Sequence, residues 1–179
     1  DNPDGRNIGL IKSMTLLCSI STASPSKAIY DIVKQNSEFI PLALINASMW
    51  EPKWTRIYLN SDLIGVLRKN SDSLHETLID QRRAGKISKF VSVSWNHLEN
   101  EYLIYTDAGR PSRPIYQEGT KPEQIKKLTT WDSIVKKHMD YIDAAETENI
   151  RISMEPFNPE LPSEIHGIAI LSASASVSP

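Results

Sequence analysis

The clearest periodic segment of the chain covers residues 67–87 and predicts a helix with two marked ends. Its apolar residues Leu74, Leu78 and Ile79 recur at a spacing of four or five residues, which places them on one helical face. Gly85 follows a basic last turn, at the position where a residue in the left-handed conformation closes a helix. The pattern therefore predicts a surface helix that is buried along one side.

The polar residues of the same segment define its start and its opposite face. Several N-cap candidates lie at 70–73, and Ser73 has capping-box spacing to Glu76. We expect the charged side chains to contact water or a partner; these are Glu76, Asp80, Arg82 and Arg83.

The chain before this helix predicts two more helices and a hairpin. The apolar run 7–21 is typical of a short buried helix, and it contains Cys18, which we expect to behave as a small hydrophobe. Ser24 and Pro25 have the residue types that begin a helix over 24–36. Residues 55–67 alternate around Asn60, Ser61 and Asp62, which indicates a β-hairpin.

After Gly85 the period changes to two, which indicates strands. Strand patterns at 90–95, 101–107 and 113–117 predict an antiparallel meander. A helix follows at 121–138 with a break at Thr129 and Thr130. The remaining patterns predict two strands around an acidic turn at 141–154, a proline-rich linker at 155–164, and a strand that enters a small-residue helix or loop at 164–179. The expected fold class is α+β, with small, mainly antiparallel sheets and packed helices.

Net charge and the lengths of the apolar runs narrow the classes of protein to which the chain could belong. The 179 residues carry a formal net charge of -2, which argues against bulk electrostatic binding of nucleic acid, although a local basic face is compatible with it. No apolar run approaches the roughly 20 residues of a membrane span. The chain has neither an initiator Met nor a leader, so we interpret it as a piece of a longer protein.

The residue types needed for metal or phosphate chemistry are sparse. One Cys and four scattered His do not predict a metal site; the histidines are His75, His97, His138 and His166. The segment 5–9, GRNIG, lacks the context of a phosphate-binding loop. Asp140 and Asp143 would share a face only on a helix, so we expect a solvated acidic loop there.

The segment Asp107, Ala108, Gly109 and Arg110 has two interpretations. A carboxylate, a free glycine and an arginine fork predict a pinned hairpin turn. The alternative is an arginine offered to a phosphate or to a neighbouring chain. Two basic clusters are interpreted as solvated faces rather than nucleic-acid tracks; they comprise Arg82, Arg83, Lys86 and Lys89, and Lys126, Lys127, Lys136 and Lys137.

Five blocks in order resemble the second-largest subunits of multisubunit DNA-dependent RNA polymerases. The first, 2–21, resembles the family's Thr-Pro-Glu-Gly-x-x-x-Gly-Leu block. The segment 104–116 is similar to its Phe-Thr-Asp-Ala-Gly-Arg turn, and 141–154 and 164–179 resemble the last two blocks before the hybrid-binding region. The remaining block is the family's Leu-x-Glu-Thr-Leu helix with its Arg-Arg-x-Gly end, matched by Arg68, Asn70, Leu74, Glu76, Thr77, Leu78, Arg82, Arg83 and Gly85.

The resemblance implies four regions: residues 1–22 as the end of the fork domain, 23–117 as external domain 1, 118–157 as external domain 2, and 158–179 as a linker and the start of the hybrid-binding domain. It implies a non-catalytic structural segment of an enzyme that synthesises RNA from NTPs on a DNA template. The two catalytic metal ions belong to aspartates of the largest subunit, so no cofactor is expected here and Mg is expected in the whole polymerase. The family's active-site lysines in this subunit would lie beyond Pro179.

The resemblance also implies partners. These are the largest and the smaller polymerase subunits, the DNA template and the RNA–DNA hybrid, without a membrane. Within the opening block we expect Arg6, Asn7 and Lys12 to lie nearest to nucleic acid in the assembled enzyme, where they would contact phosphates.

Departures from the family pattern indicate a divergent member. Asn2 and Asp4 replace the usual Thr and Glu, Gly167 stands where Pro is common, and Ser172 stands where Gly is usual. These features favour a large cytoplasmic DNA virus as the source, with the protein in the viral factory or virion; a cellular eukaryotic member would be nuclear. Two alternatives stay open: a free-standing interaction module descended from such a subunit, and an independent nucleic-acid-binding protein.

Overall fold

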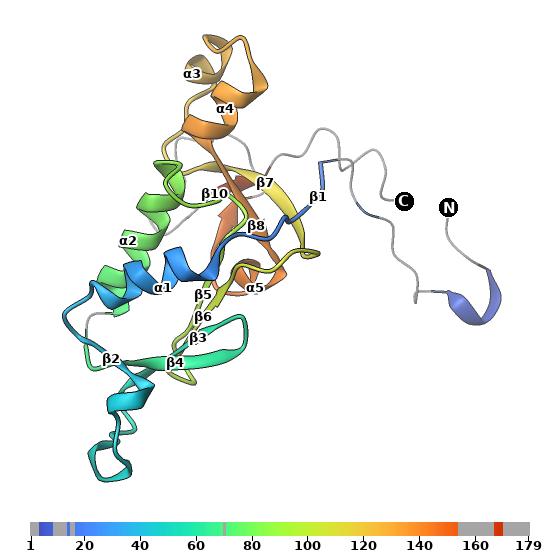
Figure 1. The fold of residues 1–179 in the computed structure, drawn as a ribbon. Coiled ribbons are helices and arrows are strands. Elements are labelled where there is room, and N and C mark those ends of the chain that lie inside the picture. The colour runs from blue at the N-terminus through green and yellow to red at the C-terminus, as the bar shows by residue number, and fades with distance from the viewer. Residues whose placement is uncertain (1–3, 9–13, 15–16, 70, 154–166, 170–179) are drawn as a thin grey trace.

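A computed structural model describes residues 4–8, 14, 17–69, 71–153 and 167–169, which form two five-stranded sheets with helices packed against them (Figure 1). The strands are β1 (Ser19–Ile20), β2 (Phe39–Pro41), β3 (Thr55–Leu59), β4 (Asp62–Leu67), β5 (Ser92–Asn96), β6 (Glu101–Tyr105), β7 (Pro111–Gln117), β8 (Met139–Asp143), β9 (Ile152–Ser153) and β10 (Gly167–Ala169). The helices are α1 (Ser26–Lys34), α2 (Ser71–Arg83), α3 (Pro122–Lys126), α4 (Trp131–His138) and α5 (Ala144–Thr147), with 3-10 turns η1 (Gly5–Asn7), η2 (Leu42–Leu44) and η3 (Ala47–Met49). The expected α+β class is confirmed.

The first sheet has the strand order β2-β4-β3-β6-β5. Its neighbours are antiparallel except for β3 and β6, which run parallel. The predicted β3–β4 hairpin is confirmed: Asn60 and Ser61 have φ of 50° and 72°, as a two-residue turn that matches the strand twist requires. The side chain of Asn60 also bonds the backbone N–H and the hydroxyl of Thr106, which holds the turn beside the end of β6.

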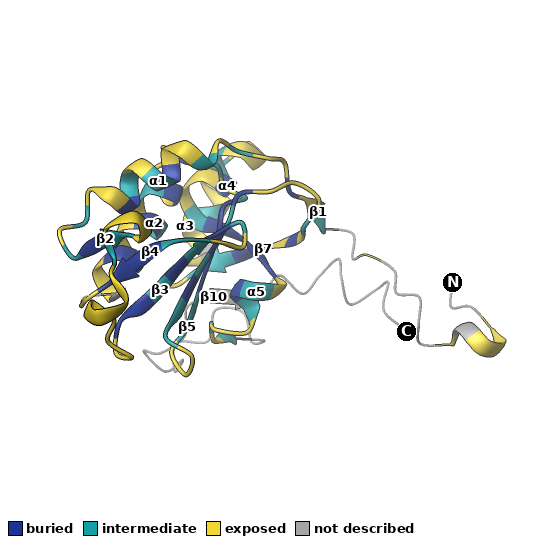
Figure 2. Cartoon of the chain, turned by 60° about the horizontal axis from the view of Figure 1, so that its bottom comes forward, coloured by how far each residue is buried: buried dark blue, intermediate teal, exposed yellow. Residues whose placement is uncertain are grey.

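Helices α1 and α2 cover one face of this sheet and close the main hydrophobic core (Figure 2). Ile29 and Val33 come from α1, and Leu74 and Leu78 come from α2; all four are buried. They pack against the buried side chains of alternate strand positions, namely Ile57, Leu59, Leu67, Val93, Tyr102 and Ile104. The amphipathic pattern thus identifies the buried face of α2.

The ends of α2 agree only partly with the prediction. Gly85 has φ +72° just beyond the last turn, as expected of a helix-closing glycine. The helix begins at Ser71, so Ser73 lies inside it rather than at its cap, and its carbonyl accepts the hydroxyl of Thr77 at 2.7 Å. The predicted capping box at Ser73 and Glu76 is therefore wrong.

The second sheet is built around β7. Strand β8 pairs along one edge of β7, and β1 and β10 pair along the other, with β9 beyond β10. The sequence pattern predicts β5, β6 and β7 as one meander, and only the β5–β6 pair is confirmed. β7 belongs to the second sheet instead. After the connection 106–110 the chain enters β7, which pairs with β8 from later in the sequence.

The elements between β7 and β9 follow the pattern closely. The predicted helix at 121–138 is interrupted as expected, with α3 ending at Lys126 and α4 beginning at Trp131. The acidic turn after β8 is a single helical turn, α5, which Asp143 caps by accepting the backbone N–H of Glu146. The predicted linker at 155–164 lies outside the described residues, as do 170–179.

The first residues do not form the expected buried helix where they are described. Ile8 is 69% exposed and Met14 is 60% exposed, and Ser19–Ile20 is strand β1. Cys18 is partly buried, with its thiol 3.8 Å from the sulfur of Met14. The remainder of the predicted helix lies outside the described residues.

Candidate functional site: an arginine junction between the sheets

Arg82 in the last turn of α2 points inward and forms a buried ion pair with Glu146 of α5. Its Nη1 donates to Glu146 Oε1 at 2.6 Å and to the carbonyl of Val91 at 2.9 Å. Glu146 Oε1 also accepts the backbone N–H of Val93 at 2.9 Å. The two side chains are only 5% and 3% exposed. The pair therefore ties α2 and β5 to α5, and the expectation that Arg82 faces solvent or a partner is wrong.

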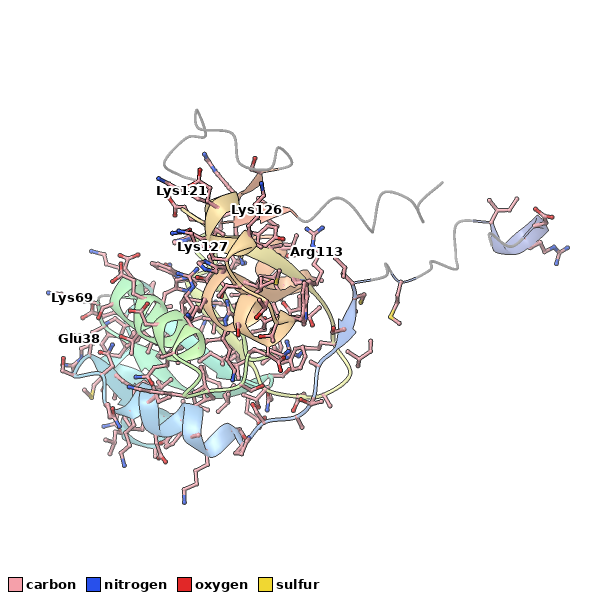
Figure 3. All side chains as sticks on the ribbon, turned by 90° about the horizontal axis from the view of Figure 1, so that it is seen from above. Glu38, Lys69, Arg113, Lys121, Lys126 and Lys127 are labelled. Carbon is pink, nitrogen blue, oxygen red and sulfur yellow. The ribbon has the colours of Figure 1, made fainter. Side chains whose placement is uncertain are left out.

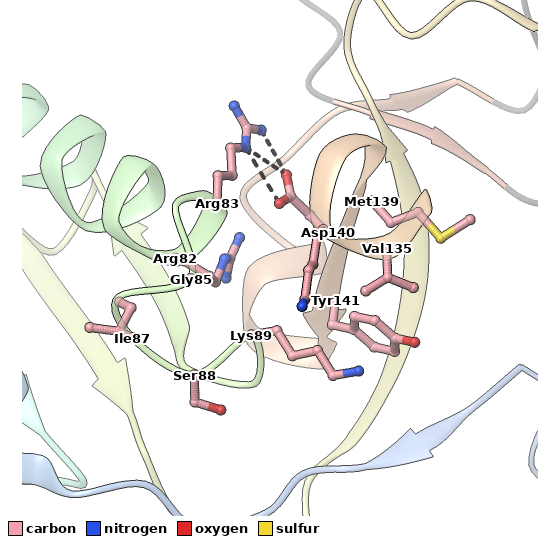
Figure 4. A pocket seen from close by; sticks show the side chains of 11 residues that line it. Arg82, Arg83, Gly85, Ile87, Ser88, Lys89, Val135, Met139, Asp140 and Tyr141 are labelled. Atoms are coloured by element: carbon pink, nitrogen blue, oxygen red, sulfur yellow. Dashed lines mark hydrogen bonds and ion pairs between the residues drawn. The ribbon is translucent and has the colours of Figure 1, made fainter. Parts of the chain in front are cut away.

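The next residue, Arg83, forms a second pair, with Asp140 of β8 (Figure 4). Its Nη2 and Nε donate to Asp140 Oδ2 at 2.7 and 3.1 Å. Gln117 Nε2 donates to the other carboxylate oxygen at 3.2 Å. The Arg83 side chain is 39% exposed whereas that of Asp140 is 7% exposed, so this pair lies at the surface of the junction.

Arg110 forms the third pair, with Asp143 at the end of β8. Nη1 donates to Asp143 Oδ2, and Nη2 donates to the carbonyls of Phe90 and Tyr105 at 2.7 and 3.2 Å. The second oxygen of Asp143 accepts the hydroxyl of Ser92 at 2.8 Å. The guanidinium is thus used inside the protein, which argues against its being offered to a phosphate.

We call the three pairs the arginine junction; its members are Arg82, Arg83, Arg110, Asp140, Asp143 and Glu146. The arginines come from α2 and from the connection between β6 and β7, and the acids come from β8 and α5. Asp140 and Asp143 are each 6% exposed, so the predicted solvated acidic loop is wrong. Sequence reasoning also missed Glu146. The available signal was a cluster of acids next to apolar strand residues, because buried carboxylates require cationic or hydrogen-bonding partners.

Burial and charge act in opposite directions on the Arg82–Glu146 pair. Burial raises the pKa of the Glu146 carboxyl above its ordinary value, and the opposing effects of Arg82 and the Val93 N–H only partly offset this. Burial lowers the pKa of Arg82, but the carboxylates of Glu146, Asp140 and Asp143 together raise it by more. Arg82 Nε and Glu146 Oε2 have no hydrogen-bond partner within the described residues, which adds to the cost of burying this pair.

The segment from Asp107 to Arg110 links the two sheets rather than closing a hairpin. Gly109 has φ +88°, and its N–H donates to the carbonyl of Ser21 at 3.0 Å. Arg110 Nε returns to the segment, but it donates to the backbone carbonyl of Asp107 at 3.2 Å rather than to the carboxylate. The hydroxyl of Ser21 donates to the same carbonyl at 3.1 Å. The turn is therefore held through backbone groups, and the Asp107 side chain is exposed.

The residues expected to contact nucleic acid, Arg6, Asn7 and Lys12, lie near the start of the chain. Arg6 and Asn7 belong to η1, where the Arg6 side chain is exposed. Lys12 lies outside the described residues. The structure does not bring Arg6 to the arginine junction, and its expected role stays a prediction.

The second basic cluster lies around α3 and α4. Lys126 and Lys127 are exposed at the end of α3, with Lys121 at its start (Figure 3). Lys136 and Lys137 are exposed in the last turn of α4. This arrangement agrees with the interpretation as a solvated face. In the first cluster, Lys86 and Lys89 are exposed, but the two arginines belong to the junction.

A pocket of about 290 Å³ opens beside the arginine junction (Figure 4). Its apolar lining includes Val135 of α4 and Met139 and Tyr141 of β8, and the opposite wall comes from the end of α2 and the chain that follows it. Lys89 and Lys136 also line it.

The described residues contain neither a candidate metal site nor a helix that could span a membrane. Among them, no group of three or more His, Cys, Asp or Glu side chains could hold a metal ion, so these residues do not fit the catalytic Mg of a polymerase. The helices in this part of the chain are all too short or too polar to cross a bilayer.

Comparisons with known proteins agree on one family. Residues 57–117 match the family model described as RNA polymerase Rpb2, domain 4. The whole chain aligns at 31% identity with DNA-directed RNA polymerase subunit Rpo2 of Sulfolobus acidocaldarius, and it covers 18% of that protein. Two further relatives each match 87% of the chain: subunit RPB2 of RNA polymerase II from Meyerozyma guilliermondii, at 28% identity over 15% of its length, and RNA polymerase subunit 2 of Acanthamoeba polyphaga mimivirus, at 26% over 14%.

The match to Rpo2 covers the whole chain and the other two cover 87% of it, but each spans less than a fifth of the relative. They include an archaeon, a yeast and a virus, so the relationship is not confined to one kind of organism. The chain belongs to the family of second-largest subunits of DNA-directed RNA polymerases and corresponds to one segment of such a subunit.

Proposed function

We propose that the chain is a non-catalytic structural segment of the second-largest subunit of a DNA-directed RNA polymerase, which synthesises RNA from NTPs on a DNA template. The observation that carries this proposal is the alignment of all of its residues with Rpo2. The arginine junction supports it, because its buried ionisable groups are paired with one another and join two sheets. Such a network stabilises a scaffold.

The proposed division of the chain is 1–22 as the end of a fork domain, 23–117 and 118–157 as two external domains, and 158–179 as a linker with the start of a hybrid-binding domain. The separate core of the first sheet supports a distinct unit within 23–117. The boundary at 117 falls directly after β7, which pairs with β8 across it. If the two regions are domains, they therefore share a sheet.

The proposed partners are the other subunits of the polymerase, and in the assembled enzyme the DNA template and the RNA–DNA hybrid. Mg would act elsewhere in the whole enzyme, on aspartates of the largest subunit. Relatives from cellular organisms and a virus leave both a nuclear and a cytoplasmic location compatible with the proposal. A viral source, and with it a viral factory or virion, stays a prediction.

The proposal is tested by fractionating the native source for template-dependent RNA synthesis and probing the fractions with antibody to this segment. We expect a band several times heavier than the 20.2 kDa of this chain that follows the activity through successive columns. The matched control omits the DNA template, which should abolish synthesis without moving the band.

The same measurement tests the alternative of a free-standing interaction module. A band near 20.2 kDa in fractions without RNA synthesis would contradict the polymerase proposal and favour the module. The full-length alignment with a polymerase subunit favours the first outcome.

A further inference from the structure

The pocket beside the arginine junction has an apolar floor and a positive rim. Val135, Met139 and Tyr141 form the floor, and all three belong to the small core under α4. Arg82 and Arg83 also line the pocket, but their charges are offset by Glu146 and Asp140. The uncompensated charge at the pocket must therefore come from its lysines.

Two lysines supply that charge. The Lys89 Nζ lies 4.4 Å from the ring centroid of Tyr141 and 5.1 Å from that of Phe90, so the rings hold the ammonium group at the pocket (Figure 4). Lys136 lies on α4 at the pocket lining. Within the described residues, neither lysine has a carboxylate within ion-pair distance, and both are exposed.

We propose that this pocket is a docking site for an acidic segment of a partner protein that inserts one apolar side chain between its carboxylates. The apolar floor would bury the inserted side chain, and Lys89 and Lys136 would pair with the flanking carboxylates. The volume of about 290 Å³ is at the lower end of ligand pockets and suits a side chain. The proposal rests on the pocket chemistry and does not depend on the proposed function.

A protein segment fits the pocket better than nucleic acid does. Phosphates would pair with the two ammonium groups but would leave the apolar floor without a contact. An acidic peptide can keep its own carboxylates at the rim and bring only an apolar side chain to the floor.

The test is fluorescence anisotropy with the 179-residue chain and a fluorescein-labelled peptide in which a Leu-Phe pair is flanked by Asp and Glu residues, at about 0.1 M salt. We expect saturable binding that weakens about tenfold or more in the double variant Lys89→Glu and Lys136→Glu. Replacing the Leu-Phe pair of the peptide by two alanines should weaken binding by a similar factor. A second double variant, Lys89→Gln and Lys136→Gln, tests the same loss without introducing new negative charge.

The matched control is Lys137→Glu, which makes the same net charge change as the double Gln variant and lies in the same turn of α4 as Lys136, but does not line the pocket. We expect less than about a twofold effect from it, and unchanged melting temperatures for all variants. An equal loss of affinity in Lys137→Glu would show that binding depends only on the overall charge of the protein, and it would overturn the proposal. Absence of saturable binding would overturn it, as would equal affinity for single-stranded oligothymidylate with the same dependence on both lysines.

Discussion

Arg82 Nη1 lies 2.6 Å from Glu146 Oε1, although the two residues are 64 positions apart in the chain. Both side chains are almost completely buried, and the guanidinium also donates to the carbonyl of Val91. Removing one partner of a buried pair of this kind is strongly unfavourable, because it leaves the other group buried without its partner. The relationship between these residues therefore connects the packing of α2 to that of α5.

Replacing Arg82 by Met should lower the free energy of unfolding by about 3–5 kcal/mol at neutral pH, because Glu146 would keep a buried charge without its guanidinium. Urea unfolding followed by circular dichroism measures the change. The matched control is Arg83→Met, which should cost about 1 kcal/mol because its pair is partly exposed to solvent. Equal losses in both variants would contradict the assignment of Arg82 as the buried member.

The Arg82–Glu146 pair should also make stability depend on pH. The folded-state pKa of Glu146 is raised above 4.5, its value without the effects of folding, so the folded state binds its proton more tightly than the unfolded state does. This contribution to stability is fully present below about pH 4.5 and is lost as the pH rises through the raised folded pKa.

The variant Glu146→Gln lacks this titration, so it isolates the effect from those of other acids. We expect the free energy of unfolding of the wild type minus that of the variant to fall as the pH rises from about 4.5 through the raised pKa. Urea unfolding of both proteins at several pH values measures the difference. A difference that is constant with pH, or that grows, would show the direction of the pKa shift to be wrong.

Replacing Arg110 by Lys should destabilise the protein by about 2 kcal/mol, because one ammonium group cannot bond Asp143 and the carbonyls of Phe90 and Tyr105 together. Thermal unfolding of both proteins is a sufficient measurement. Arg113→Lys, at an exposed position on β7, is the matched control and should leave the stability almost unchanged. Unchanged stability of the Arg110→Lys variant would favour the other interpretation, in which this arginine binds an external partner.

Replacing Gly109 by Val should destabilise the turn between the sheets by about 2 kcal/mol or more, because φ +88° is strained for a β-branched residue. The cause would be backbone strain rather than a clash, since a Cβ at this position would meet no described atom within 4 Å. The control Ala108→Val adds the same side chain type at the preceding exposed residue. Equal melting temperatures for the two variants would count against the requirement for glycine.

Replacing Arg6 by Ala should weaken retention of the RNA–DNA hybrid by the assembled polymerase if this exposed side chain contacts a phosphate. The loss of one phosphate contact should also reduce the slope of log affinity against log salt by about one. Lys34→Ala, in the last turn of α1, is the control and should change neither quantity. Unchanged hybrid retention and an unchanged salt slope for Arg6→Ala would exclude the predicted contact.

Short-range patterns predicted most of the individual elements. The turn at Asn60 and Ser61 could be predicted because the residues that tolerate positive φ lie between two alternating strands. Leu74 and Leu78 could be assigned to the core because helical periodicity repeats the buried face every three to four residues. The buried pairing of Arg82 could not be predicted in this way, because its partner lies on another element.

The sequence by itself determined that this chain forms amphipathic helices and alternating strands, and that it resembles a polymerase subunit, because local periodicity and ordered motifs are properties of neighbouring residues. Only the tertiary structure decided which strands pair with β7, and that the charged end of α2 and the acids of β8 and α5 are buried together. The physical reason is that the cost of burying a charge depends on partners that folding brings from distant parts of the chain.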